Sequence, residues 1–184
     1  RGFLGWIASG FDTRDLIALC RANLLDLAPS GHPWSGMQAY EAANVLLRIA
    51  PLAKGRFSLE SAFERFRQER SASQRQEATS DRAIEALLKA LFDLADAGAE
   101  TSFESVALAA GEFVKRFAPI RDDRDPLARN SLVDRLKEIA RSWDHTGKQT
   151  DLAQRLIALL ENHTFEALSA QPGKFHVVPL NRCG

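Results

Sequence analysis

The side chains in this sequence with the clearest chemical potential are basic and lie close together along the chain. They are Lys54, Arg56, Arg65, Arg67 and Arg70. Ammonium and guanidinium groups donate hydrogen bonds to phosphate oxygens, and such contact requires local clustering rather than an overall positive charge. Arg56 stands beside Phe57, which offers aromatic surface next to a guanidinium group. The stretch therefore predicts contact with the phosphates of DNA.

A second interpretation of the same stretch is ordinary ion pairing on a helix surface. Glu60, Glu64 and Glu69 alternate with the basic residues, and opposite charges three or four residues apart stabilise an exposed helix. A second, more scattered basic group lies further along the chain, at Lys115, Arg116, Arg121, Arg124 and Arg129.

Residue sets for catalysis, cofactor binding or metal binding are missing from the sequence pattern. No two of the four histidines share the spacing of metal ligands, and none stands near a serine or cysteine nucleophile. The segment Gly147-Lys148-Gln149 lacks the other residues of a phosphate-binding Walker A loop. Asp122, Asp123 and Asp125 lack the glycine and glutamate of a calcium-binding EF-hand loop. We therefore expect no catalytic residue, no cofactor site and no metal site in this chain.

Apolar residues three and four apart predict a helical chain that would position these groups. The expected helices cover roughly residues 13–27, 37–51, 58–70, 80–98, 101–118, 127–143 and 150–169, after a short apolar first turn at Phe3–Ile7. Asp12, Ser58 and Ser80 are the expected N-caps of three of them, and Thr101 with Glu104 is the expected capping box of a fourth. The prediction is an all-α fold, an irregular bundle of six to eight helices.

The end of the chain has a different pattern. Residues 173–184 follow Pro172 and combine β-branched and apolar residues without helical spacing, which is typical of a short buried strand. A single strand cannot satisfy its own backbone hydrogen bonds. We therefore expect a helical domain over residues 1–171, one C-terminal strand within 172–184, and a larger protein whose sheet receives that strand at Lys174–Leu180.

Composition excludes some classes of protein. The chain has 184 residues, of which 45% are hydrophobic, so it can bury one substantial core. Its 24 basic and 24 acidic residues cancel, and no apolar run approaches the length of about 20 residues that a membrane span requires. Two distant cysteines do not form a disulfide framework. These features favour a cytoplasmic protein that does not enter a membrane.

Three stretches of the sequence resemble a known family. They are Phe3–Ile7 with Gly10-Phe11-Asp12 and Asp15-Leu16-Ile17, residues 42–48 leading to Lys54-Gly55-Arg56-Phe57, and Pro172–Leu180. Their order resembles the helical accessory subdomain that is inserted in the second RecA-like motor domain of UvrD-like superfamily 1 helicases. The likeness is greatest to AddB-like proteins, which also carry a PD-(D/E)XK nuclease.

The resemblance implies a role in DNA repair or recombination. The chain would be an accessory module that contacts DNA, duplex or single-stranded, and it could also bind a partner helicase–nuclease subunit. It would itself be non-catalytic, because the ATP and Mg²⁺ sites of the helicase and the nuclease carboxylates would lie in other parts of the parent protein. The alternative is a helical protein–protein interaction module without a nucleic-acid role, which would bind a partner helix in an apolar groove.

Overall fold

The computed structural model of the chain describes residues 2–22, 25, 36–71, 78–95, 100–119 and 125–161. Within these ranges the side chains of 36–39, 69–71, 78–83 and 100 are not described. The described part contains eight helices and one short two-stranded sheet. The all-α prediction is therefore confirmed. The expected strand at Lys174–Leu180 and the boundary between residues 171 and 172 lie outside the described residues.

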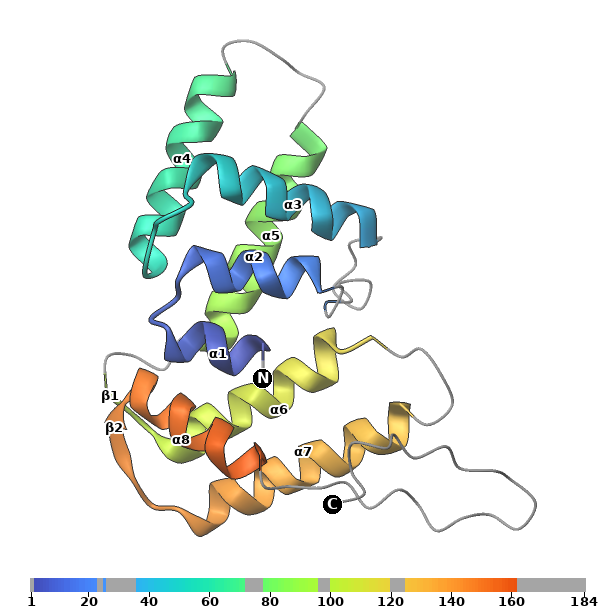
Figure 1. The fold of residues 1–184 in the computed structure, drawn as a ribbon, viewed down its shortest axis with the longest axis vertical. Coiled ribbons are helices and arrows are strands. Elements are labelled where there is room, and N and C mark those ends of the chain that lie inside the picture. The colour runs from blue at the N-terminus through green and yellow to red at the C-terminus, as the bar shows by residue number, and fades with distance from the viewer. Residues whose placement is uncertain are drawn as a thin grey trace, which may run out of the picture.

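The helices form two groups that meet at the first helix. In chain order the elements are α1 (Gly2–Ala8), α2 (Thr13–Arg21), α3 (Gly36–Ile49), α4 (Arg56–Ser71), α5 (Ala78–Ala95), β1 (Glu100–Ser102), α6 (Phe103–Phe117), α7 (Asp125–Ser142), β2 (Thr146–Lys148) and α8 (Gln149–Glu161). Figure 1 shows α3, α4 and α5 at one end of the molecule and α6, α7 and α8 at the other. Between them, α1 packs against α2, α6 and α8.

The two strands were not predicted, because the sequence indicated only helices before its C-terminal segment. β1 pairs with β2 in antiparallel register, so that Glu100 faces Lys148 and Ser102 faces Thr146. The backbone N–H of Phe103 continues the pairing by donating to the carbonyl of His145 at 2.8 Å. This short sheet ties the start of α6 to the start of α8.

Aromatic rings fill the centre of the core where the helix groups meet. Trp6 is fully buried, and its ring lies 4.9 Å from that of Phe11 and 5.0 Å from that of Phe92, measured between centroids. Phe3 stacks on Phe113 with a centroid distance of 4.4 Å. Aromatic pairs at such distances stabilise a core beyond the area that they bury. Residues from α1, α5 and α6 are therefore held in one continuous core.

Helix starts agree with the sequence in one case and differ in three. Asp12 is the N-cap of α2, as predicted. Ser58 and Ser80 are not caps, because α4 begins two residues before Ser58 and α5 begins two residues before Ser80. The N-cap of α6 is Ser102 rather than Thr101, and its hydroxyl accepts a hydrogen bond from the N–H of Ser105 at 3.1 Å. Thr101 instead belongs to β1.

Only part of the apolar surface of α3 is buried. Ala42, Ala43 and Leu46 are buried, whereas the apolar side chains of Tyr40 and Leu47 are exposed. Apolar residues surround most of this helix, so periodicity alone does not select a face. Trp143, which follows α7, is 43% exposed, and its ring lies beside that of Phe103 with a centroid distance of 5.5 Å.

None of the helices that the structure describes combines the length and the apolarity needed to cross a bilayer.

Candidate functional site: the α3–α4 hairpin and its basic residues

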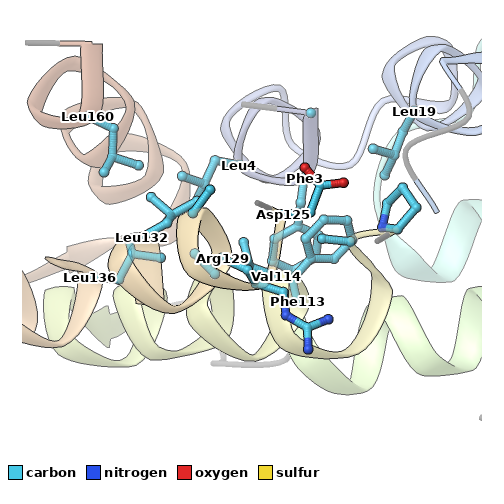
Figure 2. Close-up of a pocket in the computed structure, with 15 residues that line it drawn as sticks. Phe3, Leu4, Leu19, Phe113, Val114, Asp125, Arg129, Leu132, Leu136 and Leu160 are labelled. Atoms are coloured by element: carbon cyan, nitrogen blue, oxygen red, sulfur yellow. The ribbon is translucent and has the colours of Figure 1, made fainter. Parts of the chain in front are cut away.

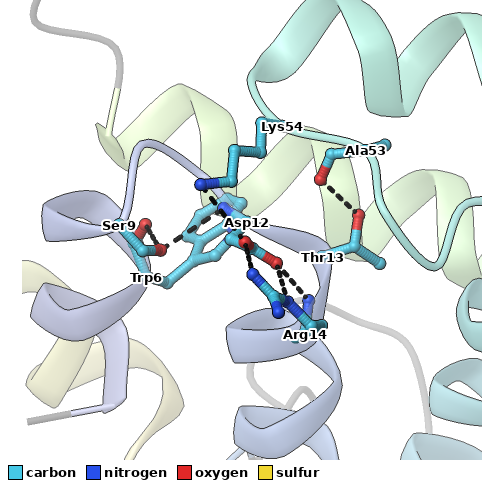
Figure 3. A network of polar contacts seen from close by, with 7 residues as sticks. All are labelled: Trp6, Ser9, Asp12, Thr13, Arg14, Ala53 and Lys54. Carbon is cyan, nitrogen blue, oxygen red and sulfur yellow. Dashed lines mark hydrogen bonds and ion pairs between the residues drawn. The ribbon is translucent and has the colours of Figure 1, made fainter.

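The predicted residue Lys54 lies where the turn between α3 and α4 meets the turn between α1 and α2. Its ammonium group is 3.6 Å from a carboxylate oxygen of Asp12, which is buried at the start of α2 (Figure 3). The same carboxylate accepts hydrogen bonds from the Arg14 guanidinium at 2.7 and 3.0 Å and from the Arg14 backbone N–H at 2.9 Å. The hydrogen bonds from the Arg14 side chain and backbone hold the pKa of Asp12 well below its ordinary value, against the opposing effect of burial.

Backbone hydrogen bonds complete this joint. Gly55 has a φ of +82°, and its N–H donates to the carbonyls of Gly10 at 3.1 Å and Phe11 at 3.3 Å. The buried Thr13 donates from both its N–H and its hydroxyl to the carbonyl of Ala53, each at 3.0 Å. We call Asp12, Thr13, Ala53, Lys54 and Gly55 the turn joint. It fastens the turn before α4 to the turn before α2, so Lys54 and Gly55 have structural roles.

The aromatic ring that lies against Arg56 belongs to Phe92 of another helix. The guanidinium carbon of Arg56 lies 5.5 Å from the ring centroid of Phe92 in α5. The same group bonds the Glu60 carboxylate at 2.8 Å and approaches that of Asp93 at 3.9 Å. Arg56 therefore connects α4 to α5 through an aromatic contact and an ion pair.

Arg67, about three turns further along α4, also connects α4 to α5. Its guanidinium donates to Glu85 of α5 at 3.1 Å and lies 3.8 Å from Glu64. The interpretation of ordinary helix-surface ion pairing thus holds for Arg56 and Arg67. Arg70 lies in α4, but its side chain is outside the described residues, as is that of Glu69.

Arg65 is separated from this paired set. Residues two positions apart on a helix do not face each other, so Arg65 points away from the side on which Arg67 meets α5. The guanidinium of Arg65 donates to the backbone carbonyl of Ser61 at 3.3 Å. Within the described part of the chain, no carboxylate lies within ion-pair distance of it.

Arg65 lies beside a second arginine that sequence reasoning did not select. The guanidinium carbon of Arg48 in α3 is 5.7 Å from the ring centroid of Phe66 in α4, and the described residues offer it no carboxylate partner. Arg48 and Arg65 line an open hollow of about 410 Å³ together with Ile49, Ala62 and Phe66. We call it the α3–α4 hollow. Its two exposed guanidinium groups are able to bind an anion such as a phosphate.

The described members of the second basic group, Lys115, Arg116 and Arg129, do not form a comparable surface. Lys115 and Arg116 both pair with Glu112, at 2.5 and 3.5 Å, and the hydrogen bond from Lys115 is the main cause that lowers the pKa of Glu112. Arg121 and Arg124 lie outside the described residues.

Arg129 instead lies at the edge of an apolar groove at the other end of the molecule. The groove has a volume of about 380 Å³ and is formed by α1, α6, α7 and the end of α8. Figure 2 shows Phe3, Leu4, Phe113, Val114, Leu132 and Leu160 among the side chains that line it. Such a surface could accept apolar side chains of a partner, as the alternative interpretation of the sequence requires.

The remaining reactive groups do not form a catalytic arrangement in the described ranges. Burial raises the pKa of the Cys20 thiol to about 12, so this cysteine is protonated at neutral pH. His145 lies 3.2 Å from the guanidinium of Arg155 at the exposed end of β2. No three of the described His, Cys, Asp or Glu side chains gather closely enough to hold a metal ion.

Two features of the site were missed because they depend on contacts between distant residues. Arg48 was noticed only as part of a helix, and its place beside Arg65 results from the packing of α3 on α4. The sequence shows Phe57 as aromatic surface beside Arg56, but it does not show that this side chain is 85% exposed.

Comparison with protein-family models, with curated proteins and with solved structures finds no match to this chain.

Proposed function

We propose that the chain is a DNA-contacting accessory module of a larger, cytoplasmic helicase–nuclease that acts in DNA repair or recombination. The parent would be an ATP-dependent enzyme of the UvrD-like or AddB-like type, using Mg²⁺, and this module would contribute no catalytic group. A partner helicase–nuclease subunit would be a further binding partner.

One observation carries the DNA-contacting part of the proposal. The guanidinium groups of Arg48 and Arg65 flank the α3–α4 hollow, and neither is neutralised by a carboxylate among the described residues. A phosphate that enters the hollow would gain two charge-assisted hydrogen-bond donors without displacing an acidic side chain.

Three other predicted basic residues would contact phosphate only by sharing or leaving their present carboxylate partners. Lys54, Arg56 and Arg67 already contact carboxylates, and all three are at least 39% exposed. Exposed ion pairs contribute only about 0–1 kcal/mol each, so a phosphate could share or replace these partners. We therefore rank Arg65 first among the predicted phosphate contacts, with Arg56, Arg67 and Arg70 as secondary ones.

A salt titration tests this assignment. We expect the double variant Arg48→Gln, Arg65→Gln to bind a DNA duplex more weakly and with a smaller salt dependence. The slope of log affinity against log salt should fall by about 0.9 for each phosphate contact that is lost. Lys115→Gln is a matched control, because Lys115 is an exposed cation that is already paired with Glu112. An unchanged slope in the double variant would exclude the α3–α4 hollow as a phosphate site.

The apolar groove favours a second candidate, a protein–protein interaction module without a nucleic-acid role. Leu132 is half-buried on the wall of this groove. If the second candidate is correct, Leu132→Glu should lower the activity of the parent protein, whereas the double variant at Arg48 and Arg65 should leave it unchanged. Thermal melting of each variant separates loss of binding from loss of folding.

A further inference from the structure

An aromatic ring at the start of α4 is almost completely open to solvent. Phe57 is 85% exposed and has no ring contact with any residue that the structure describes. The molecule buries most of its other described phenylalanines, including Phe3, Phe63 and Phe92. In Figure 1, α4 lies at the outer edge of the molecule, with α3 and α5 on one side of it only. The Phe57 ring is therefore available to a ligand.

Phe57 and Arg65, which has no carboxylate partner among the described side chains, lie along one ridge of α4. Phe57, Ser61 and Arg65 follow one another at intervals of four residues, which places them on neighbouring turns of one helix face. At a rise of about 1.5 Å per residue, Phe57 and Arg65 are about 12 Å apart along the axis. This distance corresponds to roughly three steps of a stacked strand, at about 3.4 Å each.

The geometry between the two ends of the ridge suits an extended ligand. Because Arg65 donates to the carbonyl of Ser61, its guanidinium lies toward the turn that precedes it, in the direction of Phe57. Ser61, the residue between them on the ridge, has a small side chain. Among the described side chains, the acidic groups near this ridge are Glu60 and Glu64, and each already contacts an arginine on the α5 side of the helix.

From this arrangement we propose that the ridge Phe57–Ser61–Arg65 binds single-stranded nucleic acid, with one base stacked on Phe57 and a nearby phosphate on Arg65. This inference rests on the proposed function and adds the class of substrate. The faces of paired bases are covered by their neighbours in a duplex, so an isolated ring stacks only on an unpaired base. Every base has such a face, and binding by stacking therefore tolerates any sequence.

Fluorescence anisotropy with a labelled oligothymidylate of about 16 nucleotides, the upper site size of a small single-strand-binding domain, tests the proposal. Removal of one stacking partner should lower affinity by at least about fivefold. We expect this loss for Phe57→Ala with the single strand and no comparable loss with a duplex of the same length. Phe57→Tyr keeps the ring and should retain binding. Leu52→Ala is the matched control, because Leu52 is 82% exposed in the preceding turn.

The outcomes separate this inference from the proposed function. If Arg65→Gln weakens binding but Phe57→Ala does not, phosphate contact stands and stacking is excluded. If Leu52→Ala weakens binding as much as Phe57→Ala, the turn is a general apolar contact and the stacking proposal fails. If the unmodified chain binds neither the single strand nor the duplex, both proposals fail, and the exposed Leu52 and Phe57 would then favour a protein partner.

Discussion

The buried carboxylate of the turn joint should make a measurable contribution to stability. Asp12→Asn keeps the shape of the side chain, and asparagine caps helices about as well as aspartate. The substitution removes the negative charge that the Arg14 guanidinium and Lys54 contact. Hydrogen bonds to charged groups contribute about 1.5–3 kcal/mol and neutral ones about 0.5–1.5 kcal/mol. Because both cations are more than half exposed, solvent screening favours the lower end of the difference, about 1 kcal/mol.

Thermal unfolding followed by circular dichroism measures this contribution. For a chain of this size, a loss of about 1 kcal/mol lowers the melting temperature by about 2–4 °C. Asp15→Asn is the matched control, because Asp15 lies in the first turn of the same helix and is not the cap. The control should change the unfolding free energy by no more than about 0.5 kcal/mol.

The stability that the Asp12 carboxylate contributes should also depend on pH in a defined direction. A carboxylate whose pKa is lowered by folding adds stability above its unfolded pKa, about 3.9, and this contribution is lost as the pH falls toward the folded pKa. The difference between the unmodified chain and Asp12→Asn should therefore be complete near pH 7 and smaller near pH 3. Equal melting temperatures at neutral pH would refute the assigned role of Asp12, as would a difference that stays constant into acid.

Three further substitutions and one labelling reaction test other parts of the fold. Gly55→Ala should destabilise by about 1 kcal/mol because of its positive φ, although nothing obstructs the added carbon, whereas Gly111→Ala within α6 should stabilise by up to about 1 kcal/mol. Thr13→Val removes the hydroxyl that bonds Ala53 and should cost about 1 kcal/mol in urea unfolding. Cys20 should resist thiol reagents in the folded chain and react in urea, as measured by mass spectrometry of the labelled peptide.

The fold class could be predicted because helical spacing is a local property. Leu87, Leu88 and Leu91 of α5 carry the expected stripe and are buried, and Asp12 caps α2 as expected. β1 and β2 could not be predicted, because three residues contain too little alternation and because the pairing joins distant positions, such as Glu100 and Lys148. Ser58 failed as a cap because the Gly55 carbonyl already accepts a helical bond from Leu59, so α4 begins earlier.

The candidate site was only partly predictable for a related reason. A run of basic residues shows which side chains are present, but their partners come from other helices. Glu85 and Asp93 of α5 form ion pairs with Arg67 and Arg56. Arg65 lines a hollow together with Arg48, which is not part of the basic run. The sequence therefore predicted Arg65 as a candidate contact, but it did not show that Arg48 lines the same hollow or that Asp93 and Glu85 pair with Arg56 and Arg67.

The stretches that carry the family resemblance contain residues with two different roles, one set in the turn joint and one set available to a ligand, and this division can be tested. Gly10-Phe11-Asp12 and Lys54-Gly55 are engaged in the turn joint, through backbone hydrogen bonds and a buried carboxylate. Arg48, Phe57 and Arg65 lie outside that network.

A structural role for the joint predicts that Asp12→Asn lowers the melting temperature while leaving DNA affinity, measured well below that temperature, within about twofold. Substitutions at Arg48, Phe57 or Arg65 should do the opposite, because surface changes usually alter stability by no more than about 0.5 kcal/mol. If Asp12→Asn weakened DNA binding as strongly as Arg65→Gln in a fully folded chain, the joint would be part of the binding surface, and the division of roles between the two sets would be wrong.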